Sequence, residues 1–226
     1  MDIGIFGATG VIGRAAVAEA LERGHRVTAF TRDAARIPAE PGEVTWRVAD
    51  PTDLPSARAA IAGLDVVLNA ISPGSDFADQ IANADVLPAV ARTLLTALQD
   101  RPATRLLVVG GGGSLELAPG RRLIDDPALD RTVAEVLKVP AEYSKVILAQ
   151  AEVLKLCRLS DRNWTYLSPS AARIVPGTRT GRYRIGGDQM IQKPEGESGI
   201  SAEDLAVALL DEVEIPRYIQ RRFTVG

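Results

Sequence analysis

The sequence is poor in the residue types that build metal and disulfide sites. Its one cysteine, Cys157, excludes an internal disulfide, and with a single histidine, His25, the chain cannot form a His/Cys metal cluster. Cys157 stands among leucines in a helical pattern, and nothing near it in the sequence would form a Cys–His pair. We therefore predict a buried structural thiol at Cys157, a surface turn residue at His25 and no metal site.

Excess positive charge and long apolar runs are also missing. The formal net charge of -3 argues against a nucleic-acid partner, which would require clustered lysine and arginine. No apolar run approaches the ~20 residues that span a bilayer, and no basic segment followed by an apolar stretch opens the chain. These absences predict a cytoplasmic protein with neither a nucleic acid nor a membrane as partner, and they leave its oligomeric state open.

What the chain does have is a regular succession of apolar strands and amphipathic helices. Its 226 residues, 46% hydrophobic and 24% charged, suffice for one sizeable globular domain with a modest appendage. The pattern predicts strands at 3–6, 25–30, 44–48, 64–70, 104–109, 163–169 and 223–225, and helices at 11–21, 54–62, 79–99, 140–156 and 201–212. We expect an α/β fold, a Rossmann-like doubly wound parallel sheet formed by a single domain over residues 1–226.

Two stretches depart from this succession. Residues 116–139 hold prolines and a glycine and are too irregular to place, apart from a weakly helical end. From residue 171 the composition shifts to glycine and arginine, which suggests a hairpin and loops. We predict that residues 171–200 form a small lobe on the substrate side of the domain. Within the helix predicted at 79–99, Pro88 is either tolerated or kinks the helix.

The opening residues 1–14 combine a strand, a glycine-rich turn and a helix start. Gly7, Gly10 and Gly13 follow the strand at the spacing G-x-x-G-x-x-G. Gly7 would permit the turn, Gly10 would let the backbone approach a pyrophosphate, and Gly13 would let the helix pack closely on the sheet. The helix start offers free N–H groups to phosphates. The alternative is a strand-turn-helix without ligand, which the following second strand makes less favourable.

Arg32 stands where such folds select between the two nicotinamide dinucleotides. An acidic residue at the end of the second strand binds a ribose hydroxyl, whereas a basic one accommodates a 2′-phosphate, so Arg32 favours NADP(H), with NAD(H) as the alternative. Arg32 could equally be a solvated loop residue, and Asp33 could cap a short helix. Asp50, after the third strand, either accepts a hydrogen bond from the adenine amino group or caps the next helix, a role that Thr52 and Asp53 could also fill.

Three further segments lie at the ends of predicted strands, where an open α/β sheet binds its ligands. Ala70 and Ile71 follow the strand at 64–70 and are expected to line the cofactor through their backbone. Four glycines and a serine, 110–114, follow the strand at 104–109. We expect their backbone to admit a flat ring and Ser114 to direct its hydroxyl to the reacting group, unless the loop is flexible and Ser114 solvated. Residues 168–170 face the same crevice.

The sequence resembles the atypical short-chain dehydrogenase/reductases, in the NAD(P)H-binding or NmrA-like branch that includes NADH-flavin and flavin/biliverdin-IXβ reductases. The resemblance spans nearly the whole chain and rests on Gly7-Ala-Thr-Gly-Val-Ile-Gly13, Thr31-Arg32, Asp50, the Val-Val-Gly-Gly-Gly-Gly-Ser run ending at Ser114, Trp164-Thr-Tyr-Leu-Ser-Pro169 and Ile200-Ser-Ala-Glu-Asp204. It implies an NADP(H) site with the 2′-phosphate on Arg32, the pyrophosphate around Thr9, Gly10, Val11 and Ile12, and the nicotinamide near Gly110 and Pro169.

The sequence departs from the wider superfamily in its catalytic residues. Active members carry Tyr-x-x-x-Lys on the helix after the fifth strand, where the lysine lowers the pKa of the tyrosine. Here Tyr143 is followed at that spacing by Ile147, and the residue four before Lys145 is an alanine. Ser114, Tyr143 and Lys145 remain the catalytic candidates, although the last two could be a surface pair.

These residues favour an NADPH-dependent oxidoreductase whose small-molecule substrate is a flavin, a quinone or a similar planar acceptor. Such an acceptor takes a hydride directly and can draw its proton from water or a weak donor. One alternative is a non-catalytic regulator that senses NADP(H). Another is an epimerase or dehydratase of a biosynthetic pathway, which the missing pair disfavours because that chemistry requires a base.

Overall fold

An eight-stranded sheet forms the centre of the protein. The computed structural model describes residues 1–170, 173–191 and 199–226. The strand order is β3-β2-β1-β4-β5-β8-β10-β9, and every neighbouring pair is parallel except β9 with β10. The strands are β1 (Asp2–Phe6), β2 (Arg26–Thr31), β3 (Thr45–Val48), β4 (Val66–Asn69), β5 (Arg105–Val109), β8 (Trp164–Pro169), β9 (Ile185–Gly186) and β10 (Arg221–Val225). The predicted α/β, Rossmann-like parallel sheet is confirmed.

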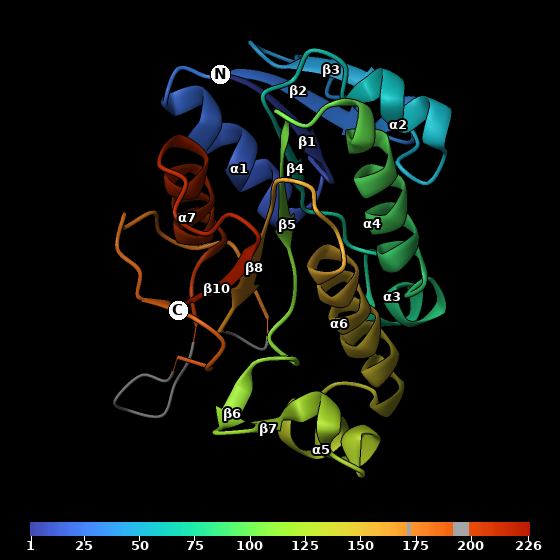
Figure 1. Cartoon of the computed structure of the whole chain (residues 1–226), viewed down its shortest axis with the longest axis vertical. Helices are drawn as coiled ribbons and strands as arrows, with labels where there is room; N and C mark the ends of the chain where they lie inside the picture. Colours follow the sequence, from blue (N-terminus) through green and yellow to red (C-terminus); the bar gives the residue numbers. More distant parts are fainter. Residues whose placement is uncertain (171–172, 192–198) are drawn as a thin grey trace.

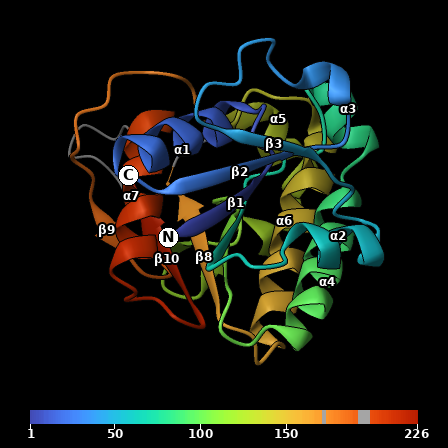
Figure 2. The same ribbon diagram turned by 90° about the horizontal axis from the view of Figure 1, so that it is seen from above.

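Helices cover both faces of the sheet, as the two views in Figures 1 and 2 show. One face carries α1 (Val11–Glu22) and α7 (Ala202–Glu214), and the other carries α2 (Leu54–Ala60), α4 (Val86–Ala97) and α6 (Ser144–Arg158). Each layer buries its own apolar cluster against the sheet. The central strands β1, β4, β5 and β8 are buried on both faces, whereas the edge strand β3 is largely exposed and its residues alternate between apolar and polar.

The helix predicted at 79–99 is in fact two helices, α3 (Phe77–Ala82) and α4. Asp76 caps the start of α3, where its carboxylate accepts a hydrogen bond of 2.9 Å from the Asp79 N–H. At the other end the Asn83 amide donates to the Asp79 carbonyl at 2.8 Å, a polar side-chain contact with a carbonyl of the last turn. Pro88 is the third residue of α4, where a missing N–H costs nothing, so it neither interrupts nor kinks a longer helix.

The region that the sequence left unplaced, 116–139, forms a small layer beyond the carboxyl ends of the strands (Figure 1). It consists of a short hairpin of β6 (Glu116–Ala118) and β7 (Arg121–Arg122), followed by α5 (Leu129–Val136). A separate apolar cluster joins α5 to Ile147 of α6. The sequence hides this layer because its strands are too short to show a period.

Most of the described part of the predicted lobe, residues 173–191, is anchored to the helices that flank the sheet. Arg179 forms two hydrogen bonds with the buried carboxylate of Glu19 on α1, at 2.6 and 2.9 Å. Thr180 donates to Asp204 on α7 through its N–H and its hydroxyl, at 2.8 and 2.6 Å. Residues 171–172 and 192–198 of the predicted lobe lie outside the described residues, and its role on the substrate side stays a prediction.

Glu19 is the centre of this anchor and provides a test of it. Hydrogen bonds from Arg179, and then from Arg23, hold the pKa of Glu19 below its ordinary value, against the opposing effect of burial. A lowered pKa in the folded state stabilises the protein above about pH 4.3, the ordinary value for glutamate, and this stabilisation disappears as the pH falls through the folded-state pKa.

We therefore expect Glu19→Gln to lower the free energy of unfolding by about 2 kcal/mol at neutral pH, with a deficit that shrinks below about pH 4. Urea unfolding across pH 3–7 measures this. The control is Glu22→Gln, an exposed neighbour on α1, which should change stability by less than about 0.5 kcal/mol. A deficit for Glu19→Gln that does not depend on pH would contradict the assignment.

Candidate functional site

The glycine-rich turn lies where the strand order reverses, between β1 and β4. Gly7 has a φ of 80°, and a Cβ there would stand 2.5 Å from the Ala70 carbonyl oxygen and 2.8 Å from the Ile71 nitrogen. A Cβ at Gly13 would stand 2.0 Å from the Gly7 carbonyl oxygen. Glycine is required at both positions because the first turn, the start of α1 and the end of β4 meet there without room for a side chain. The sequence correctly predicted the turn and the close packing of the helix.

The middle glycine is less crowded than the other two. Gly10 is extended, with φ -79° and ψ 173°, and a Cβ there would meet just the Gly7 carbonyl oxygen, at 3.2 Å. Gly10 is also the N-cap of α1, and within the described residues no side chain caps this helix. The N–H groups that open α1, at Val11 and Ile12, therefore have no side-chain acceptor and are available to an anion.

Arg14 adds a positive charge to this turn that the sequence analysis did not single out. Its guanidinium donates to the Thr9 carbonyl at 2.9 Å, so the side chain folds back over the loop. A basic residue in the first turn of a helix interacts unfavourably with the helix dipole. The position of Arg14 in the first turn of α1 is therefore unusual, and this could have singled it out from the sequence. The contact holds Thr9 in place and leaves the turn with a nearby cation.

At the next strand, Arg32 follows the end of β2 and is exposed. Its guanidinium forms neither a hydrogen bond nor an ion pair with the parts of the chain that the structure describes. Its charge does act on Asp50, beyond the neighbouring strand β3. An exposed guanidinium without a partner at this edge is chemically suited to a phosphate.

Asp50 is occupied locally. Its carboxylate accepts from the Thr52 N–H at 2.9 Å and from the Thr52 hydroxyl at 2.7 Å, and these bonds, with a smaller contribution from Arg32, lower its pKa. The cap of α2 is Asp53, which accepts from the Ser56 N–H at 2.9 Å. The capping alternative for Asp50 is thus wrong, while Asp33 does cap the short helix after it, accepting from the Ala35 N–H at 2.9 Å.

Close packing against neighbouring elements requires the glycines of the loop 110–114. A Cβ at Gly110 would stand 1.9 Å from the Tyr166 ring, and one at Gly111 would stand 1.8 Å from the Gln150 side chain. A Cβ at Gly113 would collide with α6 as well. We expected these glycines to make room for a flat ring, but the space that their missing side chains leave is filled by β8 and α6. The Tyr166 hydroxyl donates to the Gln150 carbonyl at 2.8 Å, which ties these two elements behind the loop.

Ser114 closes this loop and is buried, with 6% of its surface exposed. Its hydroxyl oxygen accepts a hydrogen bond of 2.9 Å from Arg222 on β10. This differs from both expectations for Ser114, a hydroxyl directed to a substrate and a solvated loop residue. Beside the loop, Gly110 donates to the Leu167 carbonyl at 2.8 Å, and the Gly112 Cβ position lies 3.0 Å from the Pro169 carbonyl oxygen. Gly110 and Pro169 are therefore brought to the same edge of the sheet.

Tyr143 and Lys145 lie at the start of α6 but do not form a pair. The Tyr143 ring packs edge-on against Phe77 of α3, with centroids 5.4 Å apart. Burial raises the pKa of the Tyr143 phenol, against the opposing charge of Arg173, so the hydroxyl stays protonated at neutral pH. Lys145 is exposed and lines a shallow surface pocket of about 450 Å³ with Glu142. Among the described residues, no hydrogen bond joins Ser114, Tyr143 and Lys145.

The described residues bear out the expectation of a buried structural thiol. Cys157 is buried, and burial raises the pKa of its thiol to about 12, as suits a structural thiol. Within the same residues, no three or more His, Cys, Asp or Glu side chains are grouped so that they could hold a metal ion. No helix of the described part of the chain has both the length and the apolar character that crossing a membrane requires.

Comparison with known proteins identifies relatives along the whole chain. Residues 7–216 match the model of a family described as NAD(P)H-binding. The uncharacterized protein YwnB of Bacillus subtilis is 38% identical over 230 residues, covering 100% of this chain and 98% of YwnB. A candidate exported protein of Burkholderia pseudomallei has a TM-score of 0.83, 38% identity and coverage of 100% and 99%. A candidate NADH-flavin reductase of Streptococcus pneumoniae has a TM-score of 0.81, 29% identity and coverage of 100% and 98%.

The two kinds of glycine in the turn predict different outcomes on substitution. Gly7→Ala should lower the free energy of unfolding by more than about 2 kcal/mol, because it combines a left-handed backbone with a collision. Gly63→Ala is the matched control, since Gly63 has a φ of 79° and nothing within 4 Å of its Cβ position. Gly10→Ala should stay within about 1 kcal/mol of the wild type. Urea unfolding ranks the three, and equal losses at Gly7 and Gly63 would contradict the collision.

Proposed function

The chain belongs to the NAD(P)H-binding family, and we propose that it is an NADPH-dependent reductase of a planar acceptor such as a flavin or a quinone. The observation that carries the proposal is the unpartnered Arg32 at the end of β2, next to an uncapped glycine turn at the point where the strand order reverses. A turn of this kind can bind the pyrophosphate of a dinucleotide, and a guanidinium without a partner beside it can bind the 2′-phosphate that distinguishes NADPH from NADH.

The residues present fit such a cofactor along the carboxyl edge of the sheet. In the proposed arrangement Arg32 and Asp50 face the adenosine end, and the turn of Thr9, Gly10, Val11 and Ile12 surrounds the pyrophosphate. The Gly10 N–H already donates to the Gly7 carbonyl at 2.9 Å, so the N–H groups of Val11 and Ile12 receive the phosphate oxygens. The backbone of Ala70 and Ile71 lines the middle, and Gly110 with Pro169 borders the nicotinamide end. The strand order supports this direction, because β3 and β2 lie on one side of β1 and β4, and β5 and β8 lie on the other. When bound, NADPH supplies a hydride.

A planar acceptor such as a flavin or a quinone needs little acid catalysis, and the candidate proton donor Tyr143 is a weak acid. Tyr143 keeps its proton at neutral pH because partial burial of its phenol raises its pKa, and Lys145 lines a surface pocket and forms no hydrogen bond with Tyr143 within the described residues. Tyr143 can therefore donate a proton but is a poor base, which favours reduction of an acceptor over deprotonation of a carbinol. The relative described as a candidate NADH-flavin reductase supports the same class of acceptor.

Cofactor selection can be tested through Arg32. We expect Arg32→Ala to weaken NADPH binding by about 1–3 kcal/mol, the range for charge-assisted hydrogen bonds, and to leave NADH binding nearly unchanged. Calorimetric titration of both cofactors measures this. The matched control is Arg26→Ala, which removes an arginine from the opposite end of the same strand, where it pairs with Asp2. Equal losses for NADPH and NADH would contradict the assignment of Arg32 to the 2′-phosphate.

Turnover can be tested with flavins and quinones. The wild type should oxidise NADPH faster than a protein-free control with at least one acceptor, and Tyr143→Phe should lower kcat by at most about tenfold, since water can replace a weak donor. Because the pKa of Tyr143 lies above its ordinary value, this difference should stay constant from about pH 6 to pH 9.

Tyr218→Phe is the control, because Tyr218 precedes the amino end of β10 and stacks on Phe223 in the middle of that strand, away from the carboxyl edge where the cofactor is proposed to bind. NADPH oxidation that equals the protein-free rate with every acceptor would contradict the reductase. Tight binding that discriminates NADPH from NADP without turnover would instead indicate a redox-sensing regulator.

A further inference from the structure

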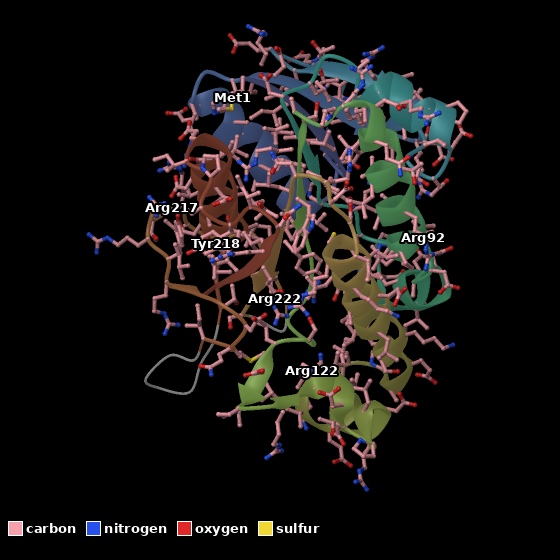
Figure 3. All side chains as sticks on the ribbon, in the orientation of Figure 1. Met1, Arg92, Arg122, Arg217, Tyr218 and Arg222 are labelled. Atoms are coloured by element: carbon pink, nitrogen blue, oxygen red, sulfur yellow. The ribbon has the colours of Figure 1, made fainter. Side chains whose placement is uncertain are left out.

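A buried arginine that the proposed chemistry does not use, Arg222, lies directly behind the loop 110–114. It projects from β10, and just 3% of its side chain is exposed. Its guanidinium donates to Ser114 twice, to the carbonyl at 3.0 Å and to the hydroxyl oxygen at 2.9 Å. Figure 3 shows Arg222 between β10 and the β6–β7 hairpin, where the chain from β5 turns away from the sheet.

The same guanidinium holds a second segment. Its Nε donates to the Asp188 carboxylate at 2.8 Å, and its Nη2 contacts the same oxygen. Asp188 lies just after β9 and is more than half exposed, and Arg158 of α6 pairs with it at 3.3 Å. The backbone carbonyl of Asp188 also accepts a hydrogen bond from the Glu116 N–H at 2.8 Å. Arg222 therefore joins β10, the end of the glycine loop and the segment after β9 through one rigid, planar group.

The placement of Arg222 follows from the register of the sheet. Arg222 is aligned with Tyr166 of β8 in a parallel pair, so the two side chains stand on the same face. Tyr166 fills the space under Gly110, and Arg222 reaches Ser114 at the other end of the loop. The backbone of 110–114 is thus fixed at one end by close packing and at the other by a buried charge.

We propose that Arg222 is a positioning residue that holds the 110–114 backbone in the shape that receives the nicotinamide end of the dinucleotide. The inference rests on the proposed NADPH site, in which this loop borders the nicotinamide while Arg32 and the glycine turn hold the rest. A loop without side chains at four successive positions has a large conformational freedom to lose on binding. Because the Arg222–Ser114 hydrogen bonds already order this loop in the free protein, cofactor binding does not have to supply the free energy of ordering it.

The proposal separates two ligands that share the adenosine half. Arg222→Met should weaken NADPH binding by about tenfold, because the loop must be ordered on binding. It should change the affinity for 2′,5′-ADP, which carries the 2′-phosphate but no nicotinamide, by less than about twofold, because Arg222 lies far from the β2 edge in the strand order. Hydrogen exchange should become faster in the peptide that covers 110–116. A merely structural loss would weaken both ligands alike.

Arg105→Met is the matched control. Arg105 is also buried, and its guanidinium donates to the Glu212 carboxylate at 2.8 Å and to the Thr165 hydroxyl at 3.2 Å, but it projects from the amino end of β5. It should lower stability without changing the ratio of NADPH to 2′,5′-ADP affinity. Asp188→Asn is a milder second variant in case Arg222→Met fails to fold, and its loss should be smaller and in the same direction.

The outcomes separate this proposal from the proposed function. A wild type that binds neither NADPH nor 2′,5′-ADP contradicts the NADPH site itself, whatever Arg222 does. A wild type that binds both, together with Arg222 and Asp188 variants whose affinity ratio equals that of the wild type, overturns the positioning role alone. An equal shift of the ratio in Arg105→Met also overturns it, because the effect would then follow stability rather than the loop.

Discussion

The close approach of the first turn to the end of β4 is the contact on which the rest of the structure depends. Gly7 touches the Ala70–Ile71 backbone, and Gly13 touches Gly7, without room for a Cβ at either. These contacts set where α1 begins and how closely it packs on the sheet. Because the strand order reverses at the same place, the uncapped start of α1 lies at the carboxyl edge between the two halves of the sheet, where open α/β sheets bind their ligands.

Two buried guanidinium groups hold the sheet at its opposite ends. Arg105, with Glu212, joins β5 to the end of α7, and both side chains are at least nine-tenths buried. Arg222, with Asp188, joins β10 to the loops beyond the carboxyl edge, and its carboxylate partner is largely exposed. The first is enclosed in the protein interior, where each charge requires the other. In the second pair, the Asp188 carboxylate lies at the surface. The Arg222 guanidinium that binds Asp188 also donates to Ser114, so it links the segment after β9 to the glycine loop.

The site is better defined for what it binds than for what it does. Phosphate recognition needs backbone N–H groups and a cation, and in the proposed function the turn after β1 and Arg32 supply them. Proton transfer needs an acid with a matched pKa, and here Tyr143 has a raised pKa without a lysine partner, while the Ser114 hydroxyl is engaged by Arg222.

The sequence by itself determined the α/β sheet, the glycine turn and the buried Cys157, because apolar runs and glycine spacing are local signals. It misplaced the boundary inside 79–99, since Asn83 closes α3 through a contact that no hydrophobic period records. The tertiary structure alone decided why 110–113 are glycines and where Arg222 lies. Both depend on residues far apart in the chain, Tyr166 behind Gly110 and Ser114 opposite Arg222, and their distances exist only once β5, β8 and β10 are side by side.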